Sequence, residues 1–439
     1  MSLPNAAPHR HDPSLTIVNA RVVLPDAVLE RATVRVDDGR ISAIEETALS
    51  PSPSQAVGQA TGPAIVDADG ALLIPGVVDL HNDNLEFEIH PRHNANLPLP
   101  FALTTMERRL AGAGVTTEFH AVSFQERLDK HRSVVDAETK AAFLAEFDDS
   151  PERPVRHNIL HRLDVRTEGS LASALPSLQR VRTPYVSLND HTPGQGQYRD
   201  VDRLIRMAEA SRTARGDFTP VEASWYLDRM RANLENTDAV DAFYASIAEA
   251  LAHTPMVIST HDDDTIQKVE AQRILGATVA EFPVTIEAAQ YARDGGMAIV
   301  VGAPNIVRGG SQSGNLNATD LVAAGLADAI CADYHAPCLI PAALKLVELG
   351  LRDLPAAIAM ITRNPARAVG LDDRGEIAIG QVADLALVRI DRFGLPQVEA
   401  TFIAGRQVLA FNRAGDRAVP DTDPATALAS ANGARPFHC

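Results

Sequence analysis

The sequence contains little cysteine and has fewer basic than acidic side chains. Its 439 residues include only three cysteines, which are too few for a disulfide framework, so we expect a reducing compartment. Cys331 and Cys338 share an apolar segment and are expected to be buried thiols. The 40 Lys and Arg residues stand against 57 Asp and Glu residues, a net charge of −17. This balance argues against nucleic acid and anionic membranes as partners, because both are bound through basic surfaces.

Long apolar runs are also missing. No run reaches the length of a transmembrane helix. Residues 1–12 show neither the apolar stretch nor the cleavage site of a signal peptide, so a cytoplasmic protein is expected. The G-x-G-x-x-G pattern of dinucleotide-binding folds does not follow the first long strand. The chain is 45% hydrophobic and 22% charged, which is typical of a folded globular protein.

Two regions at opposite ends of the chain predict short strands. Residues 34–44 alternate between apolar and polar around Asp38-Gly39, which is a strong signal for a hairpin. Residues 48–63 are expected to form a loop, and strand patterns return at 376–388 and 401–409. We therefore expect one small β-sandwich domain built from residues 14–75 and 372–415, with a C-terminal tail at 416–439.

Between these regions, strands alternate with helical segments, which is typical of βα units and a parallel sheet. Helical patterns occupy residues 201–211, 238–251, 266–275 and 286–293. Eight βα units predict a (β/α)8 barrel over residues 76–371, inserted into the β-sandwich, with its chemistry at the C-terminal strand ends. His, Asp and Glu recur near those ends, where candidate strands finish close to His81, His120, Arg166, His191, His261, Phe282, Gly302 and Asp333.

The first barrel strand ends in His81-Asn82-Asp83. Side chains two residues apart on a strand point to the same side, so His81 and Asp83 can reach one metal ion. Imidazole and carboxylate ligands suit Zn²⁺, Mn²⁺ or Fe²⁺ better than Ca²⁺. In the alternative interpretation, Asp83 caps the next turn and His81 is an exposed side chain.

A candidate anion-binding segment follows the seventh strand. Its three glycines allow backbone N–H groups to turn toward one anion, and hydroxyls and a guanidinium add further donors. A flexible linker is the alternative. The residues concerned are Arg308, Gly309, Gly310, Ser311, Ser313, Gly314 and Asn315. Further candidates for phosphate contacts are Arg92, Arg162 and Arg166, each of which could instead form a surface salt bridge.

Several longer motifs resemble the amidohydrolase superfamily and, within it, the diphosphatases of phosphonate catabolism. The resemblance extends over nearly all of residues 15–409. The matching segments include 81–85 (HNDNL), 186–195 (VSLNDHTPGQ), 259–263 (STHDD), 280–283 (AEFP), 302–315 (GAPNIVRGGSQSGN) and 362–371 (TRNPARAVGL). Asn82, His120, Asp164 and His335 depart from the pattern expected of these diphosphatases, and such departures bear on the substrate pocket.

This resemblance implies one or two divalent metal ions, with Zn²⁺ expected and Mn²⁺ or Fe²⁺ as alternatives. The implied ligands are His81, Asp83, Glu168, His191, His261 and Asp333, with Asp164 as the rival of Glu168. Asp333 is also the implied general base, which takes a proton from the attacking water. The implied substrate contacts comprise Arg92, Arg166, Asn305 and the candidate anion-binding residues after the seventh strand.

The implied reaction is cleavage of a phosphoanhydride bond. It releases pyrophosphate from α-D-ribose 1-methylphosphonate 5-triphosphate or a close relative, so the expected partner is a small anionic phosphorylated molecule. A homodimer is also expected. Hydrolysis of a C–N bond by the same metal-activated water is one alternative. The other is a barrel without catalytic activity that serves as a scaffold.

Overall fold

The structure is a computed structural model. It describes residues 14–46, 64–92, 95–126, 132–148, 153–190, 192, 194–196, 199–203, 206, 237–311 and 314–411. The predicted loop at 48–63, the C-terminal tail, most of the predicted helix at 201–211, His191 and Ser313 lie outside these residues. In the described part of the chain, no helix has both the length and the apolar character needed to cross a membrane.

Eight parallel strands form the barrel sheet, and they are paired in the order in which they follow along the chain. All ten residues of β7 are buried, as expected for a strand covered on both faces. The eight predicted strands are all confirmed. They are β6 (Val77–Asn82), β7 (Val115–Phe124), β8 (Arg156–Asp164), β9 (Tyr185–Asn189), β10 (Val257–His261), β11 (Val279–Glu281), β12 (Ala298–Gly302) and β13 (Ala329–Cys331).

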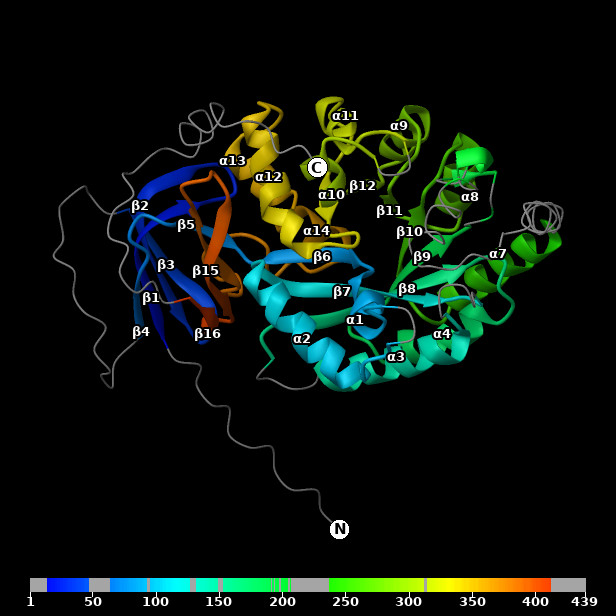
Figure 1. The fold of residues 1–439 in the computed structure, drawn as a ribbon, viewed down its shortest axis with the longest axis horizontal. Helices are drawn as coiled ribbons and strands as arrows, with labels where there is room; N and C mark the ends of the chain where they lie inside the picture. The colour runs from blue at the N-terminus through cyan, green and yellow to red at the C-terminus, as the bar shows by residue number, and fades with distance from the viewer. Residues whose placement is uncertain are drawn as a thin grey trace, which may run out of the picture.

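Helices cover the outside of the barrel sheet (Figure 1). The helical patterns predicted near 238–251, 266–275 and 286–293 correspond to α7, α8 and α9. The described helices are α1 (Asn84–Ile89), α2 (Leu99–Gly112), α3 (Val134–Asp148), α4 (Ser170–Leu178), α7 (Thr237–Leu251), α8 (Ile266–Ile274), α9 (Ile286–Asp294), α10 (Ala303–Arg308), α11 (Ala318–Ala323), α12 (Leu339–Glu348), α13 (Leu354–Ala359) and α14 (Arg363–Ala368), with the 3-10 helix η3 (Ala336–Cys338).

The first and last strands, β6 and β13, meet at the C-terminal end of the barrel. The backbone N–H of Asp83 donates to the carbonyl of Asp333 at 2.6 Å, and that of Asp333 donates to the carbonyl of His81 at 2.9 Å. Below this point the buried carboxylate of Asp79 accepts from the N–H of Ala332 at 2.8 Å. These hydrogen bonds between the two ends of the barrel sheet hold Asp333 beside the end of the first strand.

Replacement of Asp79 by Ala is expected to lower the free energy of unfolding by about 2–4 kcal/mol, because buried N–H groups lose their acceptor. Its Oδ1 accepts from Ala332 and, at 3.3 Å, from the N–H of His81. Burial raises the pKa of this carboxyl to about 7. Asp79→Asn keeps an oxygen acceptor and should cost less. Denaturant titration of both variants measures the difference, and equal losses would contradict the assigned role of the acceptor.

The two ends of the chain share a second, mixed sheet, here called the terminal sheet, at the left of Figure 1. At the predicted hairpin, Asp38 and Gly39 have φ values of 50° and 74°, as a two-residue turn of the I′ type requires. The strands of this sheet are β1 (Leu15–Val23), β2 (Val28–Asp37), β3 (Arg40–Glu46), β4 (Ala64–Asp67), β5 (Leu72–Pro75), β14 (Leu385–Ile390), β15 (Pro396–Ile403) and β16 (Arg406–Ala410).

The terminal sheet curls so that its two edges share one core. A Cβ placed on Gly405, in the turn between β15 and β16, would lie 2.7 Å from the side chain of Val36 on β2. Buried residues of β1, β2, β14 and β15 form one apolar cluster. In this sheet β5 ends at Pro75 and β14 begins at Leu385, and the barrel sheet begins at Val77. The predicted domain boundaries near 76 and 372 remain a proposal.

The strand predicted over 376–388 is wrong in its first part. Residues 376–384 form an irregular segment, and β14 begins only at Leu385. The apolar residue Ile377 in this segment is buried in the core of the terminal sheet, which explains the misleading alternation. The segment is held by isolated backbone bonds, such as those that Ile41 exchanges with Gly380 and Gln381.

Candidate metal centre

Three barrel strands bring a His, a second His and a Glu together at their C-terminal ends. His81 is near the end of β6, His261 is the last residue of β10, and Glu281 is the last residue of β11. One ligand atom from each of the three lies within 4.8 Å of the others, and all three side chains are buried. Within the described ranges, this is the group whose chemistry suits a metal ion.

Glu281 is the centre of this group. Its Oε2 lies 3.1 Å from Nδ1 of His81 and 3.2 Å from Nδ1 of His261. The two imidazole rings stack with centroids 5.4 Å apart and an angle of 17° between their planes. The ring of Phe282 meets both of them edge-on, which limits how far either ring can turn.

The Glu281 carboxylate is charged although water cannot reach it. The Tyr185 hydroxyl donates to Oε1 at 2.7 Å, and the Ser187 hydroxyl donates to Oε2 at 2.9 Å. Burial alone would raise the pKa of Glu281, but His81 and His261 outweigh it and hold the pKa well below its usual value. For His81, burial opposes the charges of Glu281 and Asp83, which together raise its pKa to about 10.

A buried guanidinium borders the three residues on one side. Arg162 Nη1 donates to Oδ1 of Asp83 at 2.6 Å, and Nη2 donates to Oδ1 of Asn189 at 3.0 Å. Nη2 also lies 3.2 Å from Nε2 of His261. Burial would raise the pKa of Asp83, but the charge of Arg162 and the contact with His81 keep it well below the usual value.

Asp333 follows β13 in a left-handed conformation, with φ of 57°. Burial and the neighbouring charge of Asp83 raise its pKa to about 7. A Cβ placed on Gly302 would lie 3.4 Å from Oδ2 of Asp333, so glycine leaves room for this carboxyl at the end of β12. Asp333 therefore lies beside the end of the first strand, next to His81 and Asp83.

These residues fit a divalent ion such as Zn²⁺, Mn²⁺ or Fe²⁺. Two imidazole nitrogens and one carboxylate oxygen are the donors those ions prefer. In a tetrahedral site with bonds of about 2.1 Å, ligand atoms stand roughly 3.4 Å apart. The 3.1 and 3.2 Å separations around Glu281 are close to that spacing. A buried, charged carboxylate between two histidines is what such an ion requires.

The structure does not bring Glu168, the middle acid that the sequence reasoning selected, into this cluster. Glu168 is exposed in the turn after β8 and is not part of the group around His81. Asp164, its rival, accepts from the N–H of Arg166 at 2.9 Å and so caps that turn. Sequence reasoning did not select Glu281, which the structure places in the cluster. The sequence signal for Glu281 was the AEFP motif at the end of the sixth barrel strand. A metal ligand is as much expected at the end of that strand as at the end of the fifth.

The two histidines whose roles the sequence left open lie apart from the metal centre. His120 is buried on β7, with Nε2 at 2.8 Å from Nδ1 of His157. His157 in turn contacts Glu107 of α2 and the ring of Phe147 on α3, so this pair packs beneath the helices. His335 is exposed at the start of η3.

The described members of the predicted substrate contacts follow the C-terminal ends of barrel strands and have different environments. Arg92 is exposed, and Arg166 is paired with Asp190 at 3.0 Å. The seventh strand leads directly into the short helix α10, which Arg308 ends with an exposed side chain. A side chain holds the segment after α10 in place, because the backbone N–H of Ser311 donates to the side-chain oxygen of Asn317.

The remaining members of this set are placed as follows. Oδ1 of Asn305 accepts from the N–H of Ala318 at 3.2 Å, which joins α10 to α11. Gly309 is the left-handed residue that ends α10, with φ of 75°. Gly310 and Asn315 are partly buried. A Cβ placed on Gly314 would collide with the guanidinium of Arg203, so a second cation adjoins this segment.

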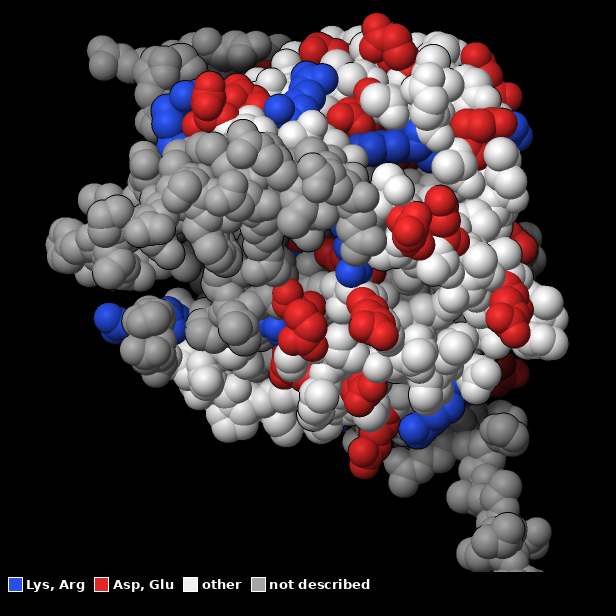
Figure 2. All heavy atoms as spheres, turned by 90° about the vertical axis from the view of Figure 1, so that its right-hand side faces the viewer, with Lys and Arg blue, Asp and Glu red and all other residues white. Residues whose placement is uncertain are grey.

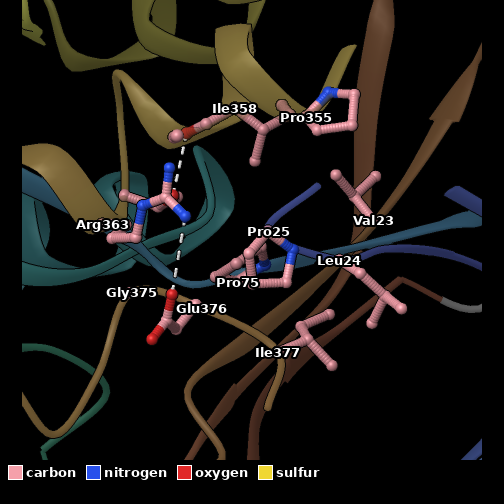
Figure 3. Close-up of a pocket in the computed structure, with 12 residues that line it drawn as sticks. Val23, Leu24, Pro25, Pro75, Pro355, Ile358, Arg363, Gly375, Glu376 and Ile377 are labelled. Carbon is pink, nitrogen blue, oxygen red and sulfur yellow. Dashed lines mark hydrogen bonds and ion pairs between the residues drawn. The ribbon is translucent and has the colours of Figure 1, made fainter. Parts of the chain in front are cut away.

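A hollow elsewhere on the surface contains none of the predicted site residues. It lies between the terminal sheet and the last helices, where Arg363 and Glu376 pair across it at 3.7 Å (Figure 3). Its lining is largely apolar and has no His or Asp.

On the face drawn in Figure 2, acidic side chains are spread more widely than basic ones. An anionic substrate would therefore depend on local cations such as those at the rim.

Several solved structures share this fold. One is a β-aspartyl dipeptidase from Fervidobacterium islandicum, with 15% identity, a TM-score of 0.57, and coverage of 93% of this chain and 100% of that one. Another is the N-acetylglucosamine-6-phosphate deacetylase of Pasteurella multocida, with 12% identity, a TM-score of 0.54, and coverage of 90% and 99%. At these identities the similarity concerns the fold.

Sequence comparison establishes the family. Residues 226–409 match the model of the amidohydrolase family. The chain belongs to this family and is a hydrolase, since it is also 32% identical over 390 residues to a relative, covering 85% of this chain and 94% of the relative. That relative is the α-D-ribose 1-methylphosphonate 5-triphosphate diphosphatase of Escherichia coli (strain K12). The sequence-based resemblance to these diphosphatases is confirmed.

Proposed function

We propose that this protein is a metal-dependent diphosphatase that releases pyrophosphate from α-D-ribose 1-methylphosphonate 5-triphosphate or a close relative. The observation that carries the proposal is the convergence of His81, His261 and Glu281 at three strand ends, in a chain similar to such a diphosphatase over nearly its whole length. The guanidiniums at the rim suit a polyanionic substrate better than a neutral amide.

His81, His261 and Glu281 are the proposed core of the metal site, with Glu281 in place of Glu168. Asp83, His191 and Asp333 remain proposed ligands from the family resemblance. When bound, a divalent ion supplies hydroxide near neutral pH and offsets negative charge on phosphoryl oxygens. Zn²⁺ is the proposed ion, with Mn²⁺ or Fe²⁺ as alternatives. A dimer and a cytoplasmic location also stay predictions.

The residues around the core have separate proposed tasks. Asp333 accepts the proton of the attacking water, since it lies beside His81 and Asp83 at the end of the first strand. Arg308 and the backbone N–H groups of Gly309, Gly310 and Ser311 orient the phosphates, because guanidinium and amide donors offset charge that grows on phosphoryl oxygens. Arg92, Arg166, Asn305, Ser313 and Asn315 complete the proposed substrate contacts.

The test is a substrate panel with the metal-loaded protein. The panel contains α-D-ribose 1-methylphosphonate 5-triphosphate, ATP as a general 5′-triphosphate, N-acetylated sugars and cyclic amides. We expect pyrophosphate from the first compound, with a kcat/KM well above that for ATP. Turnover restricted to the acetylated or cyclic amides would replace the proposal by C–N hydrolysis, and no turnover by a metal-loaded protein would favour the scaffold alternative.

Arg308→Ala should raise KM by about 5–30-fold with little change in kcat, because one partly exposed charge-assisted contact contributes roughly 1–2 kcal/mol to binding. The measurement is steady-state pyrophosphate release. Arg392→Ala removes another exposed Arg, in the connection between β14 and β15 of the terminal sheet, and serves as the control. A KM unchanged from that of the control would remove Arg308 from the substrate site.

A further inference from the structure

Arg162 is a buried cation beside the candidate metal centre. It lies on β8, two residues after Leu160, whose side chain packs in the barrel interior, so its own side chain points the same way. Only 6% of the side chain is exposed. A buried guanidinium remains charged and is costly to bury unless acceptors surround it.

Three acceptors converge on this guanidinium. They are Oδ1 of Asp83 at 2.6 Å, Oδ1 of Asn189 at 3.0 Å and Nε2 of His261 at 3.2 Å. Nε of Arg162 also donates to Asn189 at 3.3 Å. A carboxylate oxygen, an amide oxygen and an imidazole nitrogen are all atoms that coordinate divalent metals. Arg162 therefore occupies a position whose surroundings would also suit an ion.

This position adjoins the proposed ion site. His261 is common to both, since Nδ1 faces Glu281 and Nε2 faces Arg162. Ions bound at these two nitrogens would be bridged by the His261 ring, which would hold them farther apart than the roughly 3.5–4 Å typical of two-metal hydrolases. Here the space between Asp83 and His261 is filled by a side chain that carries the charge permanently.

Resting on the proposed function, we propose that Arg162 takes the place of a second metal ion, so that the centre binds one divalent ion per chain. All three guanidinium nitrogens contact protein acceptors, so Arg162 acts as a positioning residue. It holds Asp83 and His261 and supplies fixed positive charge beside the ion. Arg308, by contrast, is exposed and is proposed to contact the substrate.

The experiment is metal binding by the full-length protein, stripped with chelator and titrated with Mn²⁺. Equilibrium dialysis with elemental analysis counts the bound ions, and electron paramagnetic resonance distinguishes an isolated Mn²⁺ from a pair coupled by exchange. We expect one equivalent and the six-line spectrum of an isolated ion. Two equivalents with a coupled spectrum would overturn this inference while leaving the proposed function intact, whereas no binding would overturn both.

Variants of Arg162 provide the second arm. Arg162→Ala exposes Asp83, Asn189 and His261, so we expect it to gain a second equivalent of Mn²⁺ and a coupled spectrum. Arg162→Lys retains the charge and should stay at one equivalent. Arg166→Ala, which removes an Arg paired with Asp190 nearby, is the matched control and should also stay at one. A wild-type protein and an Arg162→Ala variant with the same stoichiometry and spectrum would overturn the assignment.

Discussion

Replacement of Glu281 by Gln is expected to weaken metal binding by about 100-fold or more and to reduce hydrolysis in proportion. The carboxylate is charged, fully buried and shared by Nδ1 of His81 and of His261. Glutamine is neutral and places an NH₂ group or a single oxygen where two imidazoles need an anion. Elemental analysis of the purified variant and competition with a metal-binding dye give the affinity directly.

Two further carboxylates make this result specific. Glu168, which sequence reasoning selected, and Glu287, on α9 just beyond β11, are both exposed. Glu168→Gln and Glu287→Gln should keep the wild-type metal content and pyrophosphate release. If instead Glu168→Gln lost the metal and Glu281→Gln retained it, the cluster around His81 would not be the metal centre.

Asp333→Asn is expected to lower kcat by about 10²–10⁴-fold, the usual contribution of a general base, while the bound metal is retained. Asn has the same shape and tolerates the left-handed backbone that Asp333 adopts, with φ of 57°. The backbone hydrogen bonds that join β6 to the end of β13 should therefore persist. The amide cannot accept a proton from water. Single-turnover kinetics combined with metal analysis separates this loss of chemistry from a loss of the ion.

Asp320→Asn, at an exposed position in the first turn of α11, is the control for this substitution and should leave kcat unchanged. Loss of metal from Asp333→Asn together with the loss of turnover would make Asp333 chiefly a ligand. Full activity of Asp333→Asn would exclude it as the base. In either case the barrel itself should remain folded, which circular dichroism can verify.

Much of the fold follows from local patterns in the sequence. The eight barrel strands were predicted because each is a short apolar run bounded by turn residues, and the Asp38-Gly39 hairpin because its two turn residues accept positive φ. The error at 376–384 has a physical cause. Burial of Ile377 in the terminal sheet produces the same apolar signal in an irregular segment as in a strand.

The metal centre was predictable only in part. His81 was selected because a ligand type stands at the end of its strand, which is a local feature, whereas His261 was selected from the family resemblance. The choice between Glu168 and Glu281 is not local, since both acids follow barrel strands. It depends on tertiary contacts, because Glu281 is buried against Tyr185 and Ser187 of β9, two strands away in the barrel sheet, whereas Glu168 is exposed.

The sequence by itself determined that this chain forms a parallel barrel with His and acid residues at the strand ends. The pattern that predicts each strand lies within a short segment, and the order of these segments is the order of the chain. Only the tertiary structure decided which side chains meet. The contacts of Glu281 with His81 and of Arg162 with His261 join residues 200 and 99 positions apart. Such distances close only when the whole sheet curves, and no local pattern encodes that closure.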